Sequence, residues 1–315
     1  MTDLRIVFMG TPAFAVGILD SIMATGYQVV GVVTAPDKPA GRGQSVSQSA
    51  VKEYALKKNL RLLQPTNLKD EGFISELKSL NANLQVVVAF RMLPEVVWKM
   101  PEFGTFNLHA SLLPQYRGAA PINWAIMNGE KTTGVTTFFI DDKIDTGATI
   151  LSREIPIGAD ENAGSLHDRL MELGSEAVVD TLKLISDGKA EPVAQPPIAD
   201  LKTAHKLNRD NCHIDFSKTA AEVHNQIRGL SPYPGAWCTF HDGGQEWQVK
   251  IFESAPDNES HSSTSGRIRV VNRQLKIAAE DKYVNVKVLQ FPGKKKMTAA
   301  ELLNGLTFSS EARVS

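Results

Sequence analysis

Residues 4–34 read LRIVFMGTPAFAVGILDSIMATGYQVVGVVT. The apolar run at residues 4–9 predicts a buried strand. Gly10 then permits a tight turn, and the Thr-Pro pair that follows suits the cap and the first position of a helix. That helix is expected to end at Gly26, before a second apolar strand at residues 28–34. The stretch therefore predicts a strand–helix–strand unit.

The alternation of strand and helix continues to about residue 185. Further strands are expected at residues 61–64, 84–89, 103–109, 135–140 and 149–155, and helices at residues 50–59, 70–80, 121–129 and 164–185. A loop is expected at residues 35–49. Strands separated by helices predict an α/β fold with a doubly wound, mostly parallel, Rossmann-like sheet. Helices on both faces of such a sheet explain why its strands are apolar throughout, as in the run Val86-Val87-Val88.

The pattern changes after a segment with three prolines, residues 187–198, which predicts an extended linker. Beyond it, one helix is expected at residues 220–228, and short strands at residues 236–240, 247–252, 266–271, 275–279 and 283–289. Asp242-Gly243-Gly244 is typical of a hairpin turn. Five short strands and one helix predict a small OB-like β-barrel. We therefore expect domains at residues 1–187 and 207–315, with a linker at 188–206.

The composition excludes several classes of protein. The chain has 315 residues and a formal net charge of -1, so a polyanionic partner must be held by local patches. Two cysteines, Cys212 and Cys238, indicate a reducing compartment. No apolar stretch approaches the roughly 20 residues that span a bilayer. The sparse cysteines and the lack of a membrane-spanning stretch lead us to expect a cytoplasmic protein. No cluster has metal-ligand spacing, so we expect no bound metal.

Asn107 and His109 form the densest pair of candidate catalytic residues. They lie two apart at the end of a predicted strand, so both side chains should point to the same face. Ligand sites of open α/β sheets lie beyond the carboxyl ends of the strands. An amide and an imidazole that donate to one carbonyl oxygen would form an oxyanion hole.

Asp145 is the third candidate, in the loop Ile144-Asp145-Thr146-Gly147. A carboxylate beside His109 would favour the charged imidazolium and could accept a proton from an attacking amine. A turn aspartate is the structural alternative, and Asp141 and Asp142 are better candidates for that role.

Two other classes of enzyme are disfavoured. The turn at Gly10 lacks the Gly-x-Gly-x-x-Gly pattern, which argues against a nicotinamide dehydrogenase. Ser111 lies near His109, but no elbow glycines flank it, which argues against a serine hydrolase.

Three segments together resemble the folate-dependent formyltransferase family. They are NLHASLLP at residues 107–114, RGAAP at 117–121 and IDTG at 144–147. FMGTP at residues 8–12, PDKPAGRG at 36–43, IDFS at 214–217 and IRGLSPYPGA at 227–236 resemble the members that act on a charged tRNA. The resemblance covers nearly the whole chain.

The resemblance implies that 10-formyltetrahydrofolate donates the formyl group and that the α-amine of methionyl initiator tRNA accepts it. It places Asn107, His109 and Asp145 in the catalytic positions of a direct transfer, without a metal or covalent intermediate. It implies folate contacts from Ser111, Leu112, Leu113, Pro114, Phe90, Arg91, Met92 and Leu93. It implies tRNA contacts from Arg42 and Lys38, and Lys294, Lys295 and Lys296 are further candidates for binding tRNA phosphates. We expect a monomer.

Three alternatives remain at this point. The acceptor could be an amino sugar or another small amine, or water, as in a formyltetrahydrofolate hydrolase. A third alternative is a tRNA-binding protein without catalysis, but it predicts degraded catalytic positions, and Asn107, His109 and Asp145 are all present.

Overall fold

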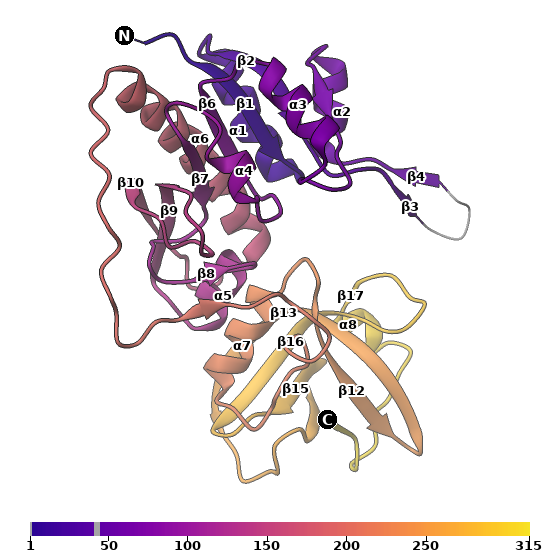
Figure 1. Ribbon diagram of the computed structural model, residues 1–315. Helices are drawn as coiled ribbons and strands as arrows, with labels where there is room; N and C mark the ends of the chain where they lie inside the picture. The colour runs from indigo at the N-terminus through magenta and orange to yellow at the C-terminus, as the bar shows by residue number, and fades with distance from the viewer. Residues whose placement is uncertain (1, 41–44) are drawn as a thin grey trace. The chain divides into compact units, whose positions relative to one another are not determined.

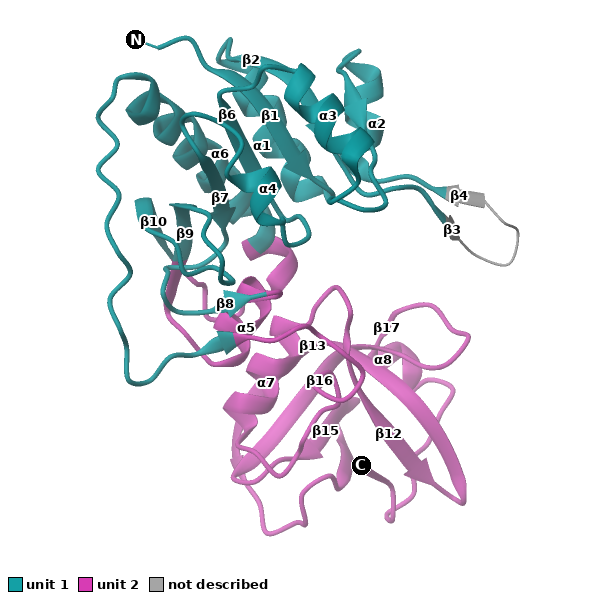
Figure 2. Cartoon of the chain, in the orientation of Figure 1, with its two compact units in different colours: residues 1–118, 134–155, 167–203 teal, residues 119–133, 156–166, 204–315 magenta. Residues whose placement is uncertain are grey.

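The computed structural model describes residues 2–40 and 45–315. The chain forms two compact units, which are coloured separately in Figure 2. Unit 1 contains residues 1–118, 134–155 and 167–203, and unit 2 contains residues 119–133, 156–166 and 204–315. The units are therefore interleaved in sequence, and the simpler domain boundaries at residues 187 and 206 stay a prediction.

The sheet of unit 1 has the strand order β10-β9-β7-β6-β1-β2-β5 (Figure 1). Its strands are β1 (Arg5–Gly10), β2 (Gln28–Val33), β5 (Leu62–Leu63), β6 (Leu84–Val88), β7 (Thr105–His109), β9 (Thr132–Phe139) and β10 (Thr149–Pro156). The pairs β1–β2, β1–β6, β2–β5 and β6–β7 are parallel, whereas β9 runs antiparallel to β7. The predicted doubly wound, mostly parallel sheet is confirmed.

Helices cover both faces of this sheet, which explains the continuous apolar strands. The helices are α1 (Ala13–Ala24), α2 (Ala50–Lys57), α3 (Glu71–Ser79), α4 (Glu95–Trp98) and α6 (Ala163–Ser186). Phe73 of α3 and Val97 of α4 share one apolar cluster with Val7 and Met9 of β1. On the opposite face, Gly174 of α6 lies so close to Leu108 of β7 that a Cβ atom at residue 174 would be 2.8 Å from the leucine Cδ2.

Two local expectations were wrong. Pro12 was expected at the first helical position, but it is the N-cap residue of α1. Thr11, which was expected to cap the helix, therefore lies before the N-cap, and no side chain caps this helix. Residues 35–49, expected as a loop, contain β3 (Lys38–Ala40) and β4 (Ser45–Ser47), which pair in antiparallel fashion. Each of these strands has only three residues, too few for a hydrophobic period to reveal it.

The segment that follows α6 returns along unit 1. Val193 pairs with Thr149 at the start of β10, through two backbone hydrogen bonds of 2.8 Å. Lys202 accepts a hydrogen bond from the Tyr116 amide at 2.7 Å. This segment, expected as an extended linker, is therefore attached to the sheet that carries the candidate site.

Unit 2 contains an antiparallel barrel with the strand order β14-β15-β16-β13-β12-β18. Its strands are β12 (Ala236–Asp242), β13 (Gln245–Ser260), β14 (Ile268–Val271), β15 (Gln274–Ala278), β16 (Lys282–Gln290) and β18 (Arg313–Val314), with β17 (Met297–Thr298) beside β16. β18 pairs with β12 on one side and bridges Arg267, just before β14, on the other, so the sheet nearly closes. The predicted OB-like barrel is confirmed, and Gly243 and Gly244 form its β12–β13 turn with positive φ angles.

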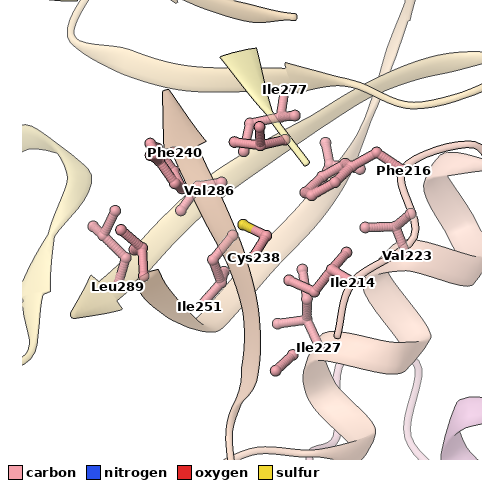
Figure 3. Packing of buried hydrophobic residues seen from close by; sticks show 14 of the residues in the cluster. Ile214, Phe216, Val223, Ile227, Cys238, Phe240, Ile251, Ile277, Val286 and Leu289 are labelled. Atoms are coloured by element: carbon pink, nitrogen blue, oxygen red, sulfur yellow. The ribbon is translucent and has the colours of Figure 1, made fainter. Parts of the chain in front are cut away.

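The barrel core is filled by alternate residues of its strands and by one face of α7 (Ala220–Gly229), as Figure 3 shows. In β12, Ala236, Cys238 and Phe240 are buried, whereas the residues between them are partly exposed. α5 (Pro121–Met127) also belongs to unit 2, where Asn123 Nδ2 donates to the Gly229 carbonyl at 2.7 Å. The helix at residues 121–129 was thus predicted correctly, but its packing partner could not be read from the sequence.

His224 of α7 is buried in unit 2, and this predicts acid sensitivity. Burial lowers the pKa of His224, and the positive charges of Arg228 and Lys287 act in the same direction, whereas Asp160 opposes them. As the pH falls, His224 therefore binds a proton near pH 6.5 in the unfolded chain, which is a higher pH than in the folded chain. The free energy of unfolding is expected to fall as the pH drops below about 6.5. Urea unfolding of the unchanged chain and of His224→Gln at pH 7.5 and 5.5 tests this. An equal loss of unfolding free energy in the two proteins at the lower pH would contradict the prediction.

Candidate active site

The candidate site lies at the carboxyl ends of neighbouring parallel strands. β7 ends at His109, β6 ends at Val88 and β1 ends at Gly10. The chain continues from β1 to β2 on one side, and β6 lies on the other side of β1, so the strand order reverses at this place. Such a switch point is where open α/β sheets bind ligands.

Asn107 and His109 lie on one face of β7, as their spacing predicted. Asn107 is opposite Val87 of β6, and His109 is opposite Thr136 of β9. Asn107 is half-buried, and among the residues that the structure describes its side chain has no hydrogen-bond partner. The amide is therefore available for a ligand.

The imidazole of His109 is buried and oriented by two groups. Its Nε2 is 2.8 Å from the Tyr116 carbonyl oxygen, which can only accept, so Nε2 carries the proton. Its Nδ1 lies 3.8 Å from Asp145 Oδ2, within ion-pair range but beyond a hydrogen bond. Since Nε2 is engaged with the backbone, Nδ1 is the nitrogen that a reacting group can meet.

Asp145 lies in a tightly constrained loop between β9 and β10. Its φ of 55° is in the left-handed region, which is uncommon for residues other than glycine. Its Oδ2 accepts a hydrogen bond from the Gly118 amide at 2.9 Å. Asp141 has the structural role considered for it, since it accepts from the Thr146 hydroxyl at 2.7 Å and from the Lys143 amide at 3.0 Å. The structure thus brings Asp145 close to His109, and Asn107 lies two residues before His109 on the same face of β7.

The segment from Ser111 to Pro114, which the resemblance implied for folate contact, leaves β7 and turns beside β9. Thr136 holds the turn, because its hydroxyl donates to the Ser111 carbonyl at 2.8 Å and accepts from the Leu113 amide at 3.2 Å. The buried Ser111 hydroxyl donates to the Gln115 carbonyl at 2.7 Å. This hydroxyl serves the turn, which agrees with the argument against a serine nucleophile.

The other implied folate segment, Phe90 to Leu93, follows β6 directly. The Arg91 guanidinium donates to the carbonyls of Pro65 and Thr66, and lies 5.7 Å from the centre of the Phe90 ring. Met92 is 65% exposed, whereas Leu93 is buried in the apolar cluster beside α4. The exposed part of this segment can reach a ligand at the sheet edge.

Gly10 has a packing role that differs from a phosphate-binding turn. A Cβ atom at this position would lie 2.6 Å from the Ala15 Cβ and 3.0 Å from the Val88 carbonyl oxygen. The glycine is therefore needed where β1 passes into α1 against β6. Packing alone therefore accounts for a glycine at this position, and no bound dinucleotide is needed to explain it.

The residues expected to contact tRNA are only partly described. Arg42 lies outside the described residues, together with residues 41, 43 and 44. Lys38 is exposed on β3, next to Asp37, whose pKa is held below its usual value by a hydrogen bond from Lys52. Lys294, Lys295 and Lys296 are exposed beside β17, and Lys296 Nζ lies 3.6 Å from the centre of the Phe252 ring.

A basic hollow in unit 2 was missed from the sequence. It is a cavity of about 660 Å³ whose charged lining residues, Lys206, Arg209 and Lys250, are all basic. The Arg209 guanidinium lies 4.4 Å from the centre of the Trp237 ring, which also lines the cavity. These residues come from separate segments, so no local sequence motif predicted the cavity.

Both parts of the chain match models of a known family. A model of the formyl transferase family matches residues 4–182, and one of its C-terminal domain matches residues 206–307. The chain belongs to the formyl transferase family. The predicted formyltransferase activity is thereby confirmed, and the predicted second domain corresponds to the family's own C-terminal domain.

Full-length relatives show which formyl transferases this chain is similar to. The methionyl-tRNA formyltransferase of Flavobacterium johnsoniae is 63% identical over 314 residues, covering 100% of both chains. That of Bacteroides thetaiotaomicron is 50% identical and covers 98% of this chain and 97% of its own. Among solved structures, the sugar 3N-formyl transferase WlaRD has a TM-score of 0.66 at 22% identity, covering 94% of this chain and 100% of its own. At that identity the structural likeness supports the fold alone.

Residues 2–40 and 45–315 contain no group of three or more His, Cys, Asp or Glu side chains placed to hold a metal ion. Over the same residues, no helix is long and apolar enough to cross a bilayer.

Proposed function

We propose that this formyl transferase moves the formyl group of 10-formyltetrahydrofolate to the α-amine of methionyl initiator tRNA. The observation that carries the proposal is the full-length match to methionyl-tRNA formyltransferases, at up to 64% identity and including the second domain. The basic hollow in unit 2 and the exposed Lys294–Lys296 segment supply local positive charge for a nucleic acid. Such patches are needed, because the net charge is only -1.

The chemistry rests on Asn107, His109 and Asp145. The neutral amine attacks the formyl carbon, a bond forms between nitrogen and carbon, and the carbonyl oxygen becomes an oxyanion. The Asn107 amide and a protonated Nδ1 of His109 donate hydrogen bonds to that oxygen. Asp145 places a negative charge beside the ring and accepts the proton that the amine loses. The carbonyl then re-forms as the carbon–nitrogen bond to tetrahydrofolate breaks, and the leaving nitrogen takes up the proton that Asp145 accepted.

The folate donor is proposed to lie between the two segments that leave β6 and β7. Phe90, Arg91 and Met92 offer an aromatic ring, a cation and an exposed apolar side chain on one side. The turn from Ser111 to Pro114 lies on the other side and includes the partly exposed Leu112 and Leu113. Leu93 supports this site from the core.

The test is incubation of the chain with 10-formyltetrahydrofolate and methionyl initiator tRNA, with analysis for N-formylmethionine after mild hydrolysis of the ester. We expect formylated product with this acceptor, at a rate that falls as salt rises, because phosphate contacts are screened. An amino sugar nucleotide and water serve as competing acceptors in parallel reactions. Formylation of the sugar alone, or release of formate without formylation of the tRNA, would overturn the proposal.

A cytoplasmic monomer also belongs to the proposal, and light scattering of the purified chain tests its oligomeric state.

A further inference from the structure

Gln195 lies in the segment after α6 and uses its whole side-chain amide to join two segments of the candidate site. Its Nε2 donates to the carbonyl oxygens of Asp145 at 2.9 Å and Gly147 at 2.8 Å. Its Oε1 accepts from Arg117, at 2.6 Å from Nη2 and 3.2 Å from Nε. A glutamine amide has two N–H donors and two acceptor positions, and all four are used here.

The first of these segments, the loop that carries Asp145, needs such support. Asp145 has a left-handed φ, which persists only when surrounding contacts determine the backbone. Gln195 fixes the carbonyls of Asp145 and Gly147, which flank Thr146 on both sides. With both peptide planes fixed, the direction in which the Asp145 carboxylate leaves the backbone is also fixed.

The second segment is Tyr116–Gly118, which includes the short strand β8 (Arg117–Gly118) and touches both catalytic partners. The Tyr116 carbonyl accepts from His109 Nε2, and the Gly118 amide donates to Asp145 Oδ2. Arg117, between them, is the residue that Gln195 binds. One side chain therefore connects the segment that orients His109 to the loop that carries Asp145.

We propose that Gln195 is a positioning residue that sets the Asp145 carboxylate relative to His109. The inference rests on the proposed roles of those two residues in formyl transfer. Gln195 touches backbone carbonyls and Arg117, so it acts through Asp145.

The test compares two variants of nearly equal size. Gln195→Met removes all four hydrogen bonds, whereas Gln195→Glu keeps an acceptor for Arg117 and loses both N–H donors. We expect both to lower kcat at least about tenfold with little change in KM for either substrate, because a displacement of about 1 Å at a reacting group can cost about a hundredfold. Normal kcat in Gln195→Glu would overturn the proposal, since Gln195 would then serve only to anchor Arg117.

A double-mutant cycle with Asp145→Asn separates positioning from general support of the fold. If Gln195 acts through Asp145, adding Gln195→Met to Asp145→Asn lowers kcat no further. Independent, multiplied losses would contradict the proposal. Thr149→Val is the matched control, because it removes a 3.2 Å hydrogen bond to Val193 in the same segment and leaves the backbone pairing there intact. It should keep full kcat, and thermal unfolding of every variant reports its folded fraction.

The cycle also distinguishes failure of the Gln195 role from failure of the proposed catalytic function. Full activity of Asp145→Asn alone would reject the proposed role of the carboxylate. A large loss in Asp145→Asn together with normal kcat in Gln195→Met would reject only the role of Gln195.

Discussion

Replacing His109 by alanine is expected to lower kcat for formyl transfer at least about a hundredfold, the usual scale for a lost oxyanion donor. The ring is buried beside Asp145, and Nδ1 is the nitrogen left for the reacting oxygen. The affinity for methionyl initiator tRNA should stay unchanged, because the buried ring adds no positive charge to the protein surface. Single-turnover kinetics with saturating tRNA, combined with a filter-binding measurement, checks both halves of this prediction.

Two further variants sharpen the result. His167→Ala removes a partly exposed histidine of α6 that pairs with the adjacent Asp168, and it should leave kcat unchanged. Asp145→Asn keeps an oxygen that can accept from the Gly118 amide, so it removes the charge while the loop retains its contacts. A comparable fall in kcat is expected for Asp145→Asn. Near-normal turnover of His109→Ala would refute the proposed oxyanion contact.

Replacing Gly147 by alanine is expected to disturb the same site through the backbone. A Cβ atom at residue 147 would lie 1.7 Å from the carbonyl oxygen of Phe139, a distance that no neighbour can accommodate without moving. Phe139 ends β9 and its amide donates to Ala148, so relief of the clash must shift the loop that carries Asp145. We expect the free energy of unfolding to fall by about 1–3 kcal/mol, as for other overpacked sites. We also expect kcat to fall about a hundredfold.

Gly305→Ala is the matched control for this substitution. No heavy atom lies within 4 Å of a Cβ built at Gly305, and its φ is not in the left-handed region. Urea unfolding and steady-state kinetics of the two variants should therefore differ sharply. A Gly147→Ala chain with unchanged stability and unchanged kcat would show that the loop can move without harm to the site, and the proposed backbone constraint on Asp145 would be wrong.

Parts of the candidate site could be predicted because they depend on short sequence intervals. The two-residue spacing of Asn107 and His109 placed them on one face, since side chains alternate along a strand. Asp145 was separated from Asp141 and Asp142 as the candidate carboxylate, and Asp141 does serve the turn. The roles of Tyr116 and Thr136 could not be predicted, because their contacts depend on how a turn folds against a neighbouring strand.

The sequence by itself determined which segments become strands and helices, and which chemical groups are present. Apolar runs specify buried strands of a parallel sheet, and Asp242-Gly243-Gly244 specifies the barrel hairpin, because these features follow from local periodicity and allowed φ values. Only the tertiary structure decided that His109 lies 3.8 Å from Asp145, that Gln195 joins Asp145 to Arg117, and that α5 packs in unit 2. Those contacts join residues tens of positions apart. They depend on the packing of complete elements, for which a local pattern carries no signal.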